Sequence, residues 1–569
     1  MPLPRTSRLH PPLALEALEQ RCLPSADVVL EWNAIALDAL KNDSLLAHPR
    51  QDNPGNASRA LAIVQAAVFD AVNSIDRSYQ PYLMEVNAPA GASITAAVAQ
   101  AAHDTLVVLF PEYQATLDAD LANDLARGGS LRSVIEGVVV GHTVAAGMMA
   151  ARSHDGSDVM MSWPVGTQPG QWQPDPLHPS QSAWGPDWGA VAPFAMPSVG
   201  QFQIPPPPPL TSQAYADAYN EVKSLGGDGV TTPTARTPEQ TEIGLFWGYD
   251  GSPGLGTPPR LYNQIAETLA VQMHNSVIAS ARFFALVNLA MADAGIAAWA
   301  AKYEYDFWRP VTAIRAGDTD GNPSTVADPT WAPLGAPEDN GGGTNFTPPF
   351  PAYPSGHATF GGALFRMMAD FFGTDDIHFT VRSDEFNGVT VDQSGKVRPY
   401  LTRSFDSFSQ AAEENGQSRI YLGIHWRFDK VEGIRLGDKI ADYVFGHWLR
   451  PSNPRPAACP VTTSALSAPA ALSTGTPDAG LVAALVRQRV PAATPPLAGP
   501  VMAPGPDGHG GAGLPPALRL TADPLPADLM VGVPSSRLRG GVGGDPADDL
   551  DPALSAGSLA WTTLGDGAD

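Results

Sequence analysis

Apolar residues recur at the spacing of an α-helix over most of the first 451 residues. In the segment 58–77, apolar residues stand at positions 61, 64, 68 and 72, and a serine that can cap a helix stands at position 58. Nine more segments share this pattern, and the helices so predicted are 93–110, 133–152, 212–225, 259–274, 277–292, 294–308, 358–372, 407–422 and 431–449. Strand-like alternation is scarce, and 389–391 is the best short candidate. The pattern predicts an all-α fold.

Two long loops rich in proline and glycine separate the predicted helices. They cover residues 161–210, which include a run of five prolines at 205–209, and residues 317–354. Loops of this length inside a compact protein generally line a functional surface. We therefore expect both loops to lie close to a binding or catalytic site.

The composition changes sharply after residue 451. Residues 452–569 contain 18 Pro, no Lys, no Glu and a single aromatic residue, Trp561. Such a segment buries too little apolar area to offset the entropy lost on ordering. We therefore expect a flexible leader at 1–25, one helical domain at 26–451 and a disordered tail rich in Ala, Pro and Gly at 452–569.

The net charge excludes one large class of partners. With 34 basic and 58 acidic residues, the net charge is −24, and such a surface repels phosphate backbones, so we expect no nucleic-acid binding. Two cysteines, Cys22 and Cys459, exclude a disulfide framework. The apolar stretch 137–151 holds a His and three Gly and is shorter than the roughly 20 residues of a membrane span. We expect no membrane span.

The N-terminal residues have no apolar core followed by a cleavage site, so the sequence predicts no standard secretory signal. A cytoplasmic location is then the default expectation, and export by another route stays open.

Two separated segments carry candidate chemistry on predicted helices. In AWAAKYEYDFWRP, Lys302 and Arg309 are seven residues apart, so both would project from one face of a single helix. In FPAYPSGHATFGG, a serine, a glycine and a histidine (Ser355, Gly356 and His357) stand at a predicted helix N-terminus. Backbone N–H groups and the helix dipole favour an anion at that place.

A third segment, SRIYLGIHWRFD, holds Arg419 and His425 six residues apart. On one straight helix they would lie about 120° apart, but Gly423 can break the helix and turn His425 back toward Arg419. Taken singly, each segment also fits a solvated basic edge, an ordinary helix cap or a core histidine. Together, three fixed cations, amide donors and two imidazoles suit a tetrahedral oxyanion.

The order Lys-x6-Arg-Pro, Pro-Ser-Gly-His and Ser-Arg-x5-His resembles the three-part signature shared by vanadium-dependent haloperoxidases and the type 2 phosphatidic-acid phosphatase superfamily. Longer strings, including WGYDGSPGLGTPPRLYNQI and PPFPAYPSGHATFGGA, resemble the vanadium chloroperoxidase branch in particular. The resemblance is dense over 240–450 and thinner over 26–240. It implies helical bundles in two four-helix-bundle-like halves.

The resemblance also implies roles for individual residues. It implies that His425 bonds vanadium, that His357 is the acid–base catalyst and that Lys302 polarises the bound peroxide. The groups implied to bind the vanadate cofactor are Lys302, Arg309, Ser355, the Gly356 amide, Arg419 and His425.

Three further residues are implied to support this pocket. Asp250 would fix the charged shell, while Trp299 and Phe350 would flank the halide. Relatives that prefer bromide carry polar residues at the last two places, so the Trp and Phe found here favour chloride.

The implied function is vanadate-dependent oxidation of chloride or bromide by hydrogen peroxide to hypohalous acid. One alternative is a soluble acid phosphatase, in which the same pocket holds phosphate, His425 is the nucleophile and His357 protonates the leaving group. A non-enzymatic scaffold whose tail binds partners is a third class. The sequence leaves open the organic acceptor of the halogen and whether the chain forms a homo-oligomer.

Overall fold

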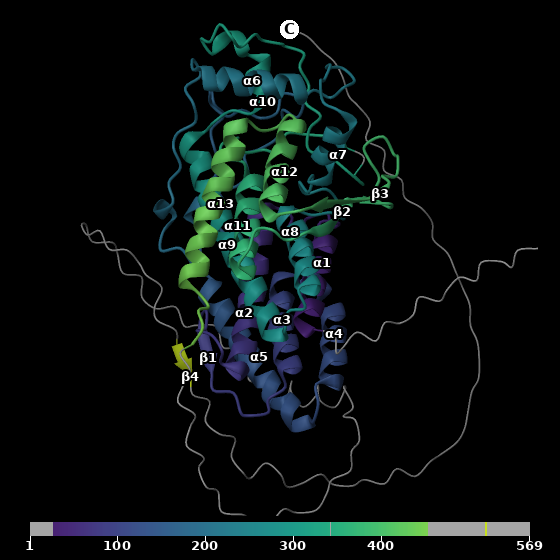
Figure 1. Ribbon diagram of the computed structural model, residues 1–569, viewed down its shortest axis with the longest axis vertical. Helices are drawn as coiled ribbons and strands as arrows, with labels where there is room; N and C mark the ends of the chain where they lie inside the picture. Colours follow the sequence, from purple (N-terminus) through teal and green to yellow (C-terminus); the bar gives the residue numbers. More distant parts are fainter. Residues whose placement is uncertain (1–26, 342, 453–517, 521–569) are drawn as a thin grey trace, which may run out of the picture. The chain divides into compact units, whose positions relative to one another are not determined.

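Helices make up most of the chain that is described by the computed structural model, which covers residues 27–341, 343–452 and 518–520 (Figure 1). This confirms the predicted all-α class. The α-helices are α1 (Val28–Asp43), α2 (Pro54–Asp76), α3 (Ile94–Leu109), α4 (Gln114–Arg127), α5 (Leu131–Arg152), α6 (Gln213–Leu225), α7 (Pro238–Phe246), α8 (Pro258–Gln272), α9 (Val277–Tyr305), α10 (Pro310–Arg315), α11 (Gly356–Phe372), α12 (Phe408–Tyr421) and α13 (Arg427–His447). Short 3-10 turns are η1 (Pro111–Tyr113), η2 (Trp188–Ala190), η3 (Val199–Gln201) and η4 (Gly317–Thr319).

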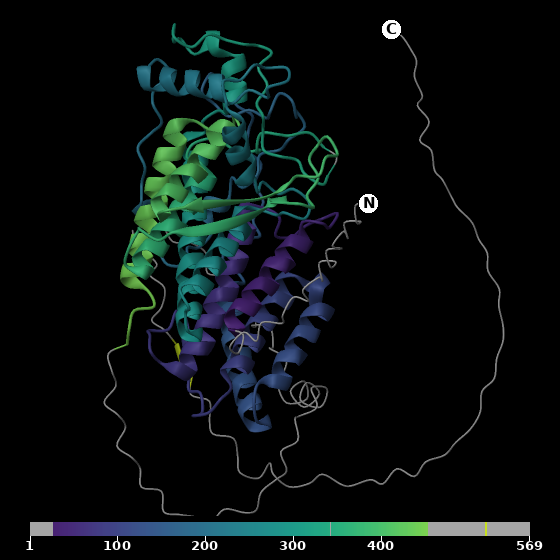
Figure 2. The same cartoon turned by 45° about the vertical axis from the view of Figure 1, so that its right-hand side comes forward.

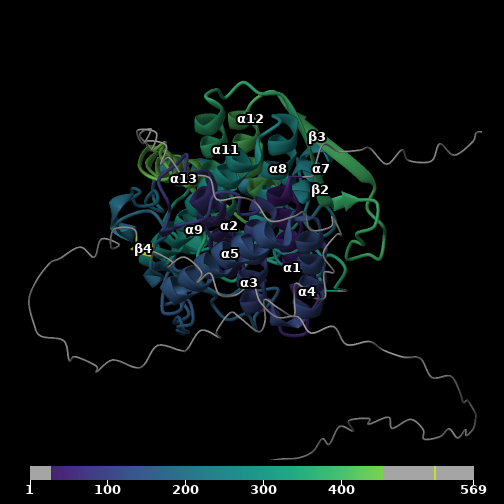
Figure 3. The same cartoon turned by 90° about the horizontal axis from the view of Figure 1, so that it is seen from below.

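The helices of residues 27–452 form two bundles. In the first bundle, α3 packs against α1, α2, α4 and α5. In the second, α11 packs against α9, α12 and α13. Figure 3 shows the first group end-on at one side and α11 and α12 at the other. Helix α9 belongs to both bundles, because it packs on α2 as well as on α11 and α13.

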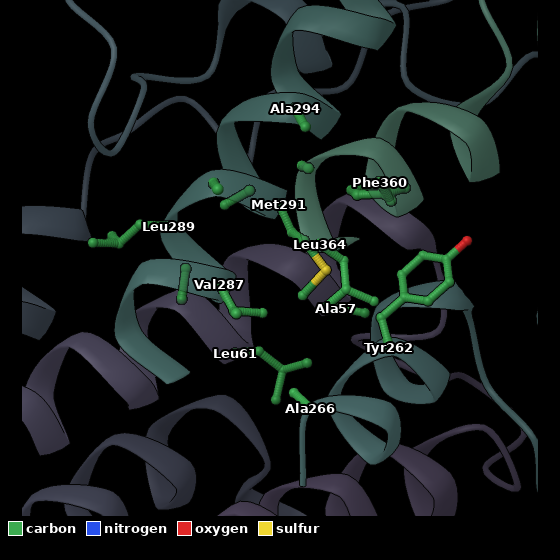
Figure 4. Packing of buried hydrophobic residues seen from close by; sticks show 14 of the residues in the cluster. Ala57, Leu61, Tyr262, Ala266, Val287, Leu289, Met291, Ala294, Phe360 and Leu364 are labelled. Carbon is green, nitrogen blue, oxygen red and sulfur yellow. The ribbon is translucent and has the colours of Figure 1, made fainter. Parts of the chain in front are cut away.

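The core is continuous where α2, α8, α9 and α11 meet (Figure 4). Leu61 of α2, Met291 of α9 and Leu364 of α11 are all buried there. Helices α9 and α11 approach closely at Gly295, where a Cβ atom would lie 2.9 Å from the ring of Phe360. Burial of this apolar surface is the main force that joins the two bundles.

Helix α9 corrects one prediction. The sequence predicted separate helices at 277–292 and 294–308, but one helix runs from Val277 to Tyr305. It ends at Asp306, which adopts a left-handed conformation with φ of 49°. Lys302 therefore lies in the last turn of α9, whereas Arg309 lies just before α10. The prediction that both project from one face of a single helix is wrong, because the chain turns between them.

The predicted position of the strand was also wrong. A hairpin is formed by β2 (Phe379–Asn387) and β3 (Tyr400–Phe405), which pair antiparallel. Figure 2 shows it running across the side of the second bundle, and β2 packs on α8 while β3 packs on α12. Residues 389–391 lie outside both strands, and Val391 only bridges to Val397. A second small sheet pairs β1 (Met84–Val86) in parallel with β4 (Leu518–Leu520).

Two of the described helices, α5 and α9, are long and apolar enough to cross a membrane by length and composition alone. The apolar window of α9 is 94% buried, as in a core helix, and that of α5 is 50% buried. The predicted leader at 1–25 lies outside the described residues. So does the predicted tail, except for residues 452 and 518–520.

Candidate active site

The three segments predicted to carry chemistry meet at one cavity of about 230 Å³. Seven of the predicted residues line it, namely Asp250, Trp299, Phe350, Gly356, His357, Arg419 and His425. The other three, Lys302, Arg309 and Ser355, adjoin that lining. The Lys302 ammonium nitrogen lies 5.1 Å from the centre of the Phe350 ring, and Arg309 Nη1 lies 3.0 Å from His425 Nε2. Ser355 is the residue next to Gly356 in the chain.

The N-terminus of α11 opens onto the cavity. Ser355 caps the helix, since its Oγ accepts a hydrogen bond from the Ala358 N–H at 3.4 Å. Its own N–H donates to the Asp429 carbonyl at 3.1 Å, which anchors the turn to α13. A Cβ atom at Gly356 would lie 3.3 Å from the Trp299 ring, so a side chain there would crowd this wall. The predicted helix N-terminus is therefore present.

Arg419 in the last turn of α12 is held by a carboxylate. Its Nη2 donates to both oxygens of Asp250, at 2.8 and 2.6 Å. Burial raises the pKa of Asp250, and the Arg419 charge acts against that shift. The bidentate contact fixes the guanidinium, while Arg419 Nε is buried with no hydrogen-bond partner among the described residues.

Arg309 approaches the cavity from the other side. Its Nε donates to the Phe350 carbonyl at 2.8 Å, and its Nη1 donates to the Ile424 carbonyl at 2.9 Å and points at His425 Nε2. Burial lowers its pKa to about 9. Its remaining nitrogen, Nη2, is buried and has no partner within the described residues.

The break predicted at Gly423 is confirmed. Helix α12 ends at Tyr421, Gly423 has a φ of 76°, and His425 lies in the turn before α13. The turn lets His425 line the same cavity as Arg419, instead of lying about 120° from it around one helix, and places it beside Arg309.

A carboxylate missed by sequence reasoning orients His425. His425 Nδ1 lies 2.8 Å from Asp429 Oδ2, which also accepts the Trp426 N–H at 3.1 Å. Burial raises the pKa of Asp429 to about 7, against the opposing charges of Lys302 and Arg309. The contact places the imidazole proton on Nδ1, so Nε2 is an acceptor, and its lone pair meets Arg309 Nη1 at 3.0 Å. The i, i+4 spacing of His and Asp in HWRFD was the signal available.

His357 is held by its backbone. Its carbonyl accepts hydrogen bonds from Tyr262 Oη at 3.1 Å and Asn415 Nδ2 at 2.9 Å. Its ring hydrogen-bonds the Trp247 backbone, while Nε2 is buried with no partner among the described residues. Burial and the Arg419 charge lower its pKa well below the usual value, so the imidazole is neutral.

Lys302 uses all its donors within the protein. Its Nζ donates to the carbonyls of Pro351 at 2.8 Å, Ala352 at 3.0 Å and Pro354 at 2.5 Å. Burial and the Arg309 charge lower its pKa well below the usual value. Lys302 thus fixes the loop before α11 and supplies positive potential, and it does not line the cavity.

An aromatic wall closes the cavity. The rings of Trp299 and Phe350 lie 5.0 Å apart, and Trp184 meets them edge-on at 5.1 and 6.3 Å. Sequence reasoning missed Trp184, although the loop 161–210 that carries it was expected to line a functional surface. Phe350 comes from the other predicted loop, 317–354, so both loops contribute to the site.

The residues present fit a tetrahedral oxyanion. Three buried nitrogens without partners in the described chain, Arg309 Nη2, Arg419 Nε and His357 Nε2, belong to side chains around the cavity beside the helix N-terminus. Nowhere in the described residues do three or more His, Cys, Asp or Glu side chains form a group suited to a metal ion. The donor set favours an anion held by cations and amides. His425 Nε2, which faces Arg309 Nη1, is the imidazole atom that could bond the central atom of the anion.

Comparisons with known proteins find relatives of the C-terminal bundle. Residues 282–454 match the family model described as the VCPO second helical-bundle domain. The vanadium chloroperoxidase of Curvularia inaequalis is 44% identical over 261 residues, which are 39% of this chain and 42% of that protein. The C-terminal bundle is thus similar in sequence to vanadium chloroperoxidase. The alignment thus spans about two fifths of the length of the curated relative.

Solved structures of vanadium haloperoxidases share the fold over a longer region. A bacterial vanadium-dependent iodoperoxidase superposes with a TM-score of 0.61 at 24% identity, covering 75% of this chain and 98% of its own. A bacterial vanadium-dependent chloroperoxidase in its holo form gives a TM-score of 0.55 at 16% identity, covering 73% of this chain and 97% of its own. At these identities, the similarity shows the helical-bundle fold alone.

Proposed function

We propose that this chain oxidises halide with hydrogen peroxide, using vanadate bound in the cavity. The reaction consumes halide, hydrogen peroxide and one proton, and it yields hypohalous acid and water. The observation that carries the proposal is the set of three unpartnered buried nitrogens beside a neutral His425 backed by Asp429. The similarity to a vanadium chloroperoxidase over 261 residues supports it.

The donor set assigns the binding groups. His425 Nε2 would bond vanadium, since Asp429 keeps the proton on Nδ1. Arg309 Nη2 and Arg419 Nε would bind oxygens, as would Ser355 and the Gly356 amide at the helix N-terminus. Lys302 would add positive potential from behind the loop. Bound vanadate supplies a Lewis acid that activates hydrogen peroxide.

His357 is the proton carrier in this proposal. Its neutral imidazole has Nε2 free, so it can take a proton from hydrogen peroxide and deliver it to a departing oxygen. The hydrogen bond to the Trp247 backbone fixes the ring while the proton moves.

The aromatic wall supports a halide site that can oxidise chloride as well as bromide. Trp184, Trp299 and Phe350 exclude water from one side of the cavity. In a poorly hydrated site, positive charge acts more strongly on the reacting oxygen. Chloride is the hardest of the three common oxidisable halides to oxidise and gains most from that effect.

The test is halogenation of monochlorodimedone by purified protein stripped of metal and then supplied with orthovanadate. We expect activity to depend on vanadate and to be inhibited by phosphate, because both oxyanions compete for one donor set. Chloride, bromide and iodide are assayed in parallel. Full activity in vanadium-free protein would contradict the proposal. Hydrolysis of p-nitrophenyl phosphate with no halogenation under any condition would establish the phosphatase alternative instead.

A further inference from the structure

The cavity has a second polar end that the proposed chemistry does not use. Its floor consists of fully or nearly buried residues such as His357, Arg419 and His425, whereas Trp184, Phe350 and Asp52 are only partly buried and mark the rim. Asp52 lies between α1 and α2, in the bundle that supplies no other charged lining residue. The rim thus carries a carboxylate opposite a cationic floor.

The Asp52 carboxylate is not neutralised by the protein. Its Oδ1 is buried without a hydrogen-bond partner, and no ion pair within the described residues includes Asp52. Burial raises its pKa to about 7, and the like charges of Asp43 and Glu338 act in the same direction. A Cβ atom at Gly251 would lie 3.8 Å from both of its oxygens, so the carboxylate is packed against the turn after Asp250.

We propose that the rim binds an organic halogen acceptor that carries an ammonium group next to an aromatic ring, with Asp52 as the group that recognises the cation. This inference rests on the proposed function and names a substrate class for it. The aromatic wall of Trp184, Trp299 and Phe350 suits both a flat ring and a cation held over a ring face. The uncompensated carboxylate of Asp52 gives the cation its partner.

The charge distribution sets the orientation of such an acceptor. Arg419 at the floor and Arg309 behind the lining repel a cation, so the ammonium group stays at Asp52 and the ring extends toward the floor. The ring then lies where hypohalous acid is released. In the transfer, a ring carbon bonds the halogen, the oxygen–halogen bond breaks, and the displaced ring proton leaves with the hydroxide as water.

A different role for Asp52 would give different kinetics. An ionised carboxylate at the rim could act as a barrier that repels entering halide, without contact to any acceptor. Removal of the charge would then lower the KM for halide and affect all acceptors equally. We favour recognition of the acceptor because Asp52 lies among rings and prolines that form a binding wall.

The experiment uses vanadate-loaded protein, bromide and three phenols that differ in charge. They are N,N,N-trimethyltyramine (cationic, with no N–H to halogenate), N-acetyltyramine (neutral) and 4-hydroxyphenylacetate (anionic). The variant is Asp52→Asn, and the matched control is Glu338→Gln. Glu338 acts on Asp52 through its charge but does not line the cavity. Ring bromination is measured by mass spectrometry, and binding of trimethyltyramine is measured separately by calorimetry.

We expect the wild type to prefer the cationic phenol over the neutral and anionic ones. Asp52→Asn should lower kcat/KM for trimethyltyramine and its calorimetric affinity by about tenfold, the loss typical of one partly buried charge pair. The values for the other two phenols and the KM for bromide should stay within about twofold, and Glu338→Gln should change each value by less than that.

An equal change for all three phenols, or a change confined to the KM for bromide, would overturn the proposal. If no phenol is halogenated, the proposed function fails, and the calorimetric comparison of wild type with Asp52→Asn still decides whether the rim binds the cation.

Discussion

Asp70 in the first bundle and two site arginines in the second are all buried, but the chain completes the hydrogen bonds of Asp70 alone. In the first bundle, Asp70 of α2 accepts three backbone hydrogen bonds, from Tyr82 at 2.7 Å, Leu83 at 2.8 Å and Met84 at 3.0 Å. In the second, Arg309 and Arg419 are equally buried, yet each keeps a nitrogen without a partner among the described residues. The chain completes the hydrogen bonds of Asp70, whereas Arg309 and Arg419 each keep a nitrogen that can donate to a ligand.

This difference separates stability from binding. Loss of a fully bonded structural group leaves orphaned amides in the core and destabilises the fold. Loss of a partly bonded site group removes ligand affinity, and the remaining protein keeps its packing. The five predictions below test this separation, from the largest expected effect to the smallest.

The two site histidines should fail in different ways. His425→Ala should abolish vanadate binding at micromolar concentrations and lower the halogenation rate by about 10³-fold or more. His357→Ala should retain vanadate and lose about 10²-fold or more in rate, because only proton transfer is removed. Equilibrium dialysis and monochlorodimedone assays check both variants, with circular dichroism as the control for folding. Equal vanadate affinity in the two variants would show that the roles are assigned wrongly.

Asp70→Ala should destabilise the fold and leave vanadate binding unchanged. Three buried N–H groups lose their acceptor, which costs about 3 kcal/mol or more of unfolding free energy. Urea unfolding measures the loss, and the vanadate affinity of the folded fraction should stay unchanged. A weaker affinity per folded molecule would mean that the first bundle shapes the site directly.

Asp429→Asn should have an intermediate effect confined to the site. The Asn side chain has the same shape but no charge. His425 therefore becomes a weaker ligand, and its proton is held less firmly on Nδ1. We expect vanadate affinity to fall by about 10- to 100-fold, measured by dialysis. An unchanged affinity would show that the contact only supports the turn before α13.

Phe350→His should change halide choice more than vanadate binding. The imidazole adds a polar group to the aromatic wall and admits water, so chloride turnover should fall while most bromide turnover stays. The ratio of chloride to bromide kcat/KM, measured at saturating vanadate and acidic pH, should drop by about tenfold. An unchanged ratio would show that the aromatic wall does not determine the halide preference.

Asp52→Asn should have a small effect on stability that depends on pH. The pKa of Asp52 is raised to about 7 in the folded state from an ordinary value of 3.8, so folding favours the protonated form. The contribution of Asp52 to folding stability is fully present below pH 4 and is lost as pH rises through 7. The variant should therefore melt higher than wild type at pH 8, with a much smaller difference at pH 5. A larger gain at pH 5 would contradict the raised pKa.

The sequence predicted what depends on local pattern. Most helices follow from the 3.6-residue period, and all ten candidate residues lie in or beside one cavity. The helices α1, α4, α7 and α10 were missed, and α7 and α10 are short, with 9 and 6 residues. In α1 the apolar residues Trp32, Ala36, Leu37 and Leu40 carry a clear helical pattern, whereas α4 buries few apolar side chains.

The rest depends on contacts distant in sequence. Nothing local marks the end of α9, because Asp306 turns left-handed without a nearby glycine or proline. Trp184 and Asp52 reach the cavity from segments more than 100 residues before the matched signature, and only the fold brings them there. Asp429 was within reach, because its spacing from His425 is fixed by one helical turn.

Helix α9 makes the two bundles one cooperative unit. Besides packing on α2, α11 and α13, it carries Asp293, which accepts hydrogen bonds from the amides of Phe194, Ala195 and Met196. Neither bundle can open without exposing a face of this helix, so local unfolding of one is opposed by the other. An oxyanion bound near the C-terminal end of α9 should therefore slow amide hydrogen exchange along α2, beyond the first residue, Pro54, which lines the cavity.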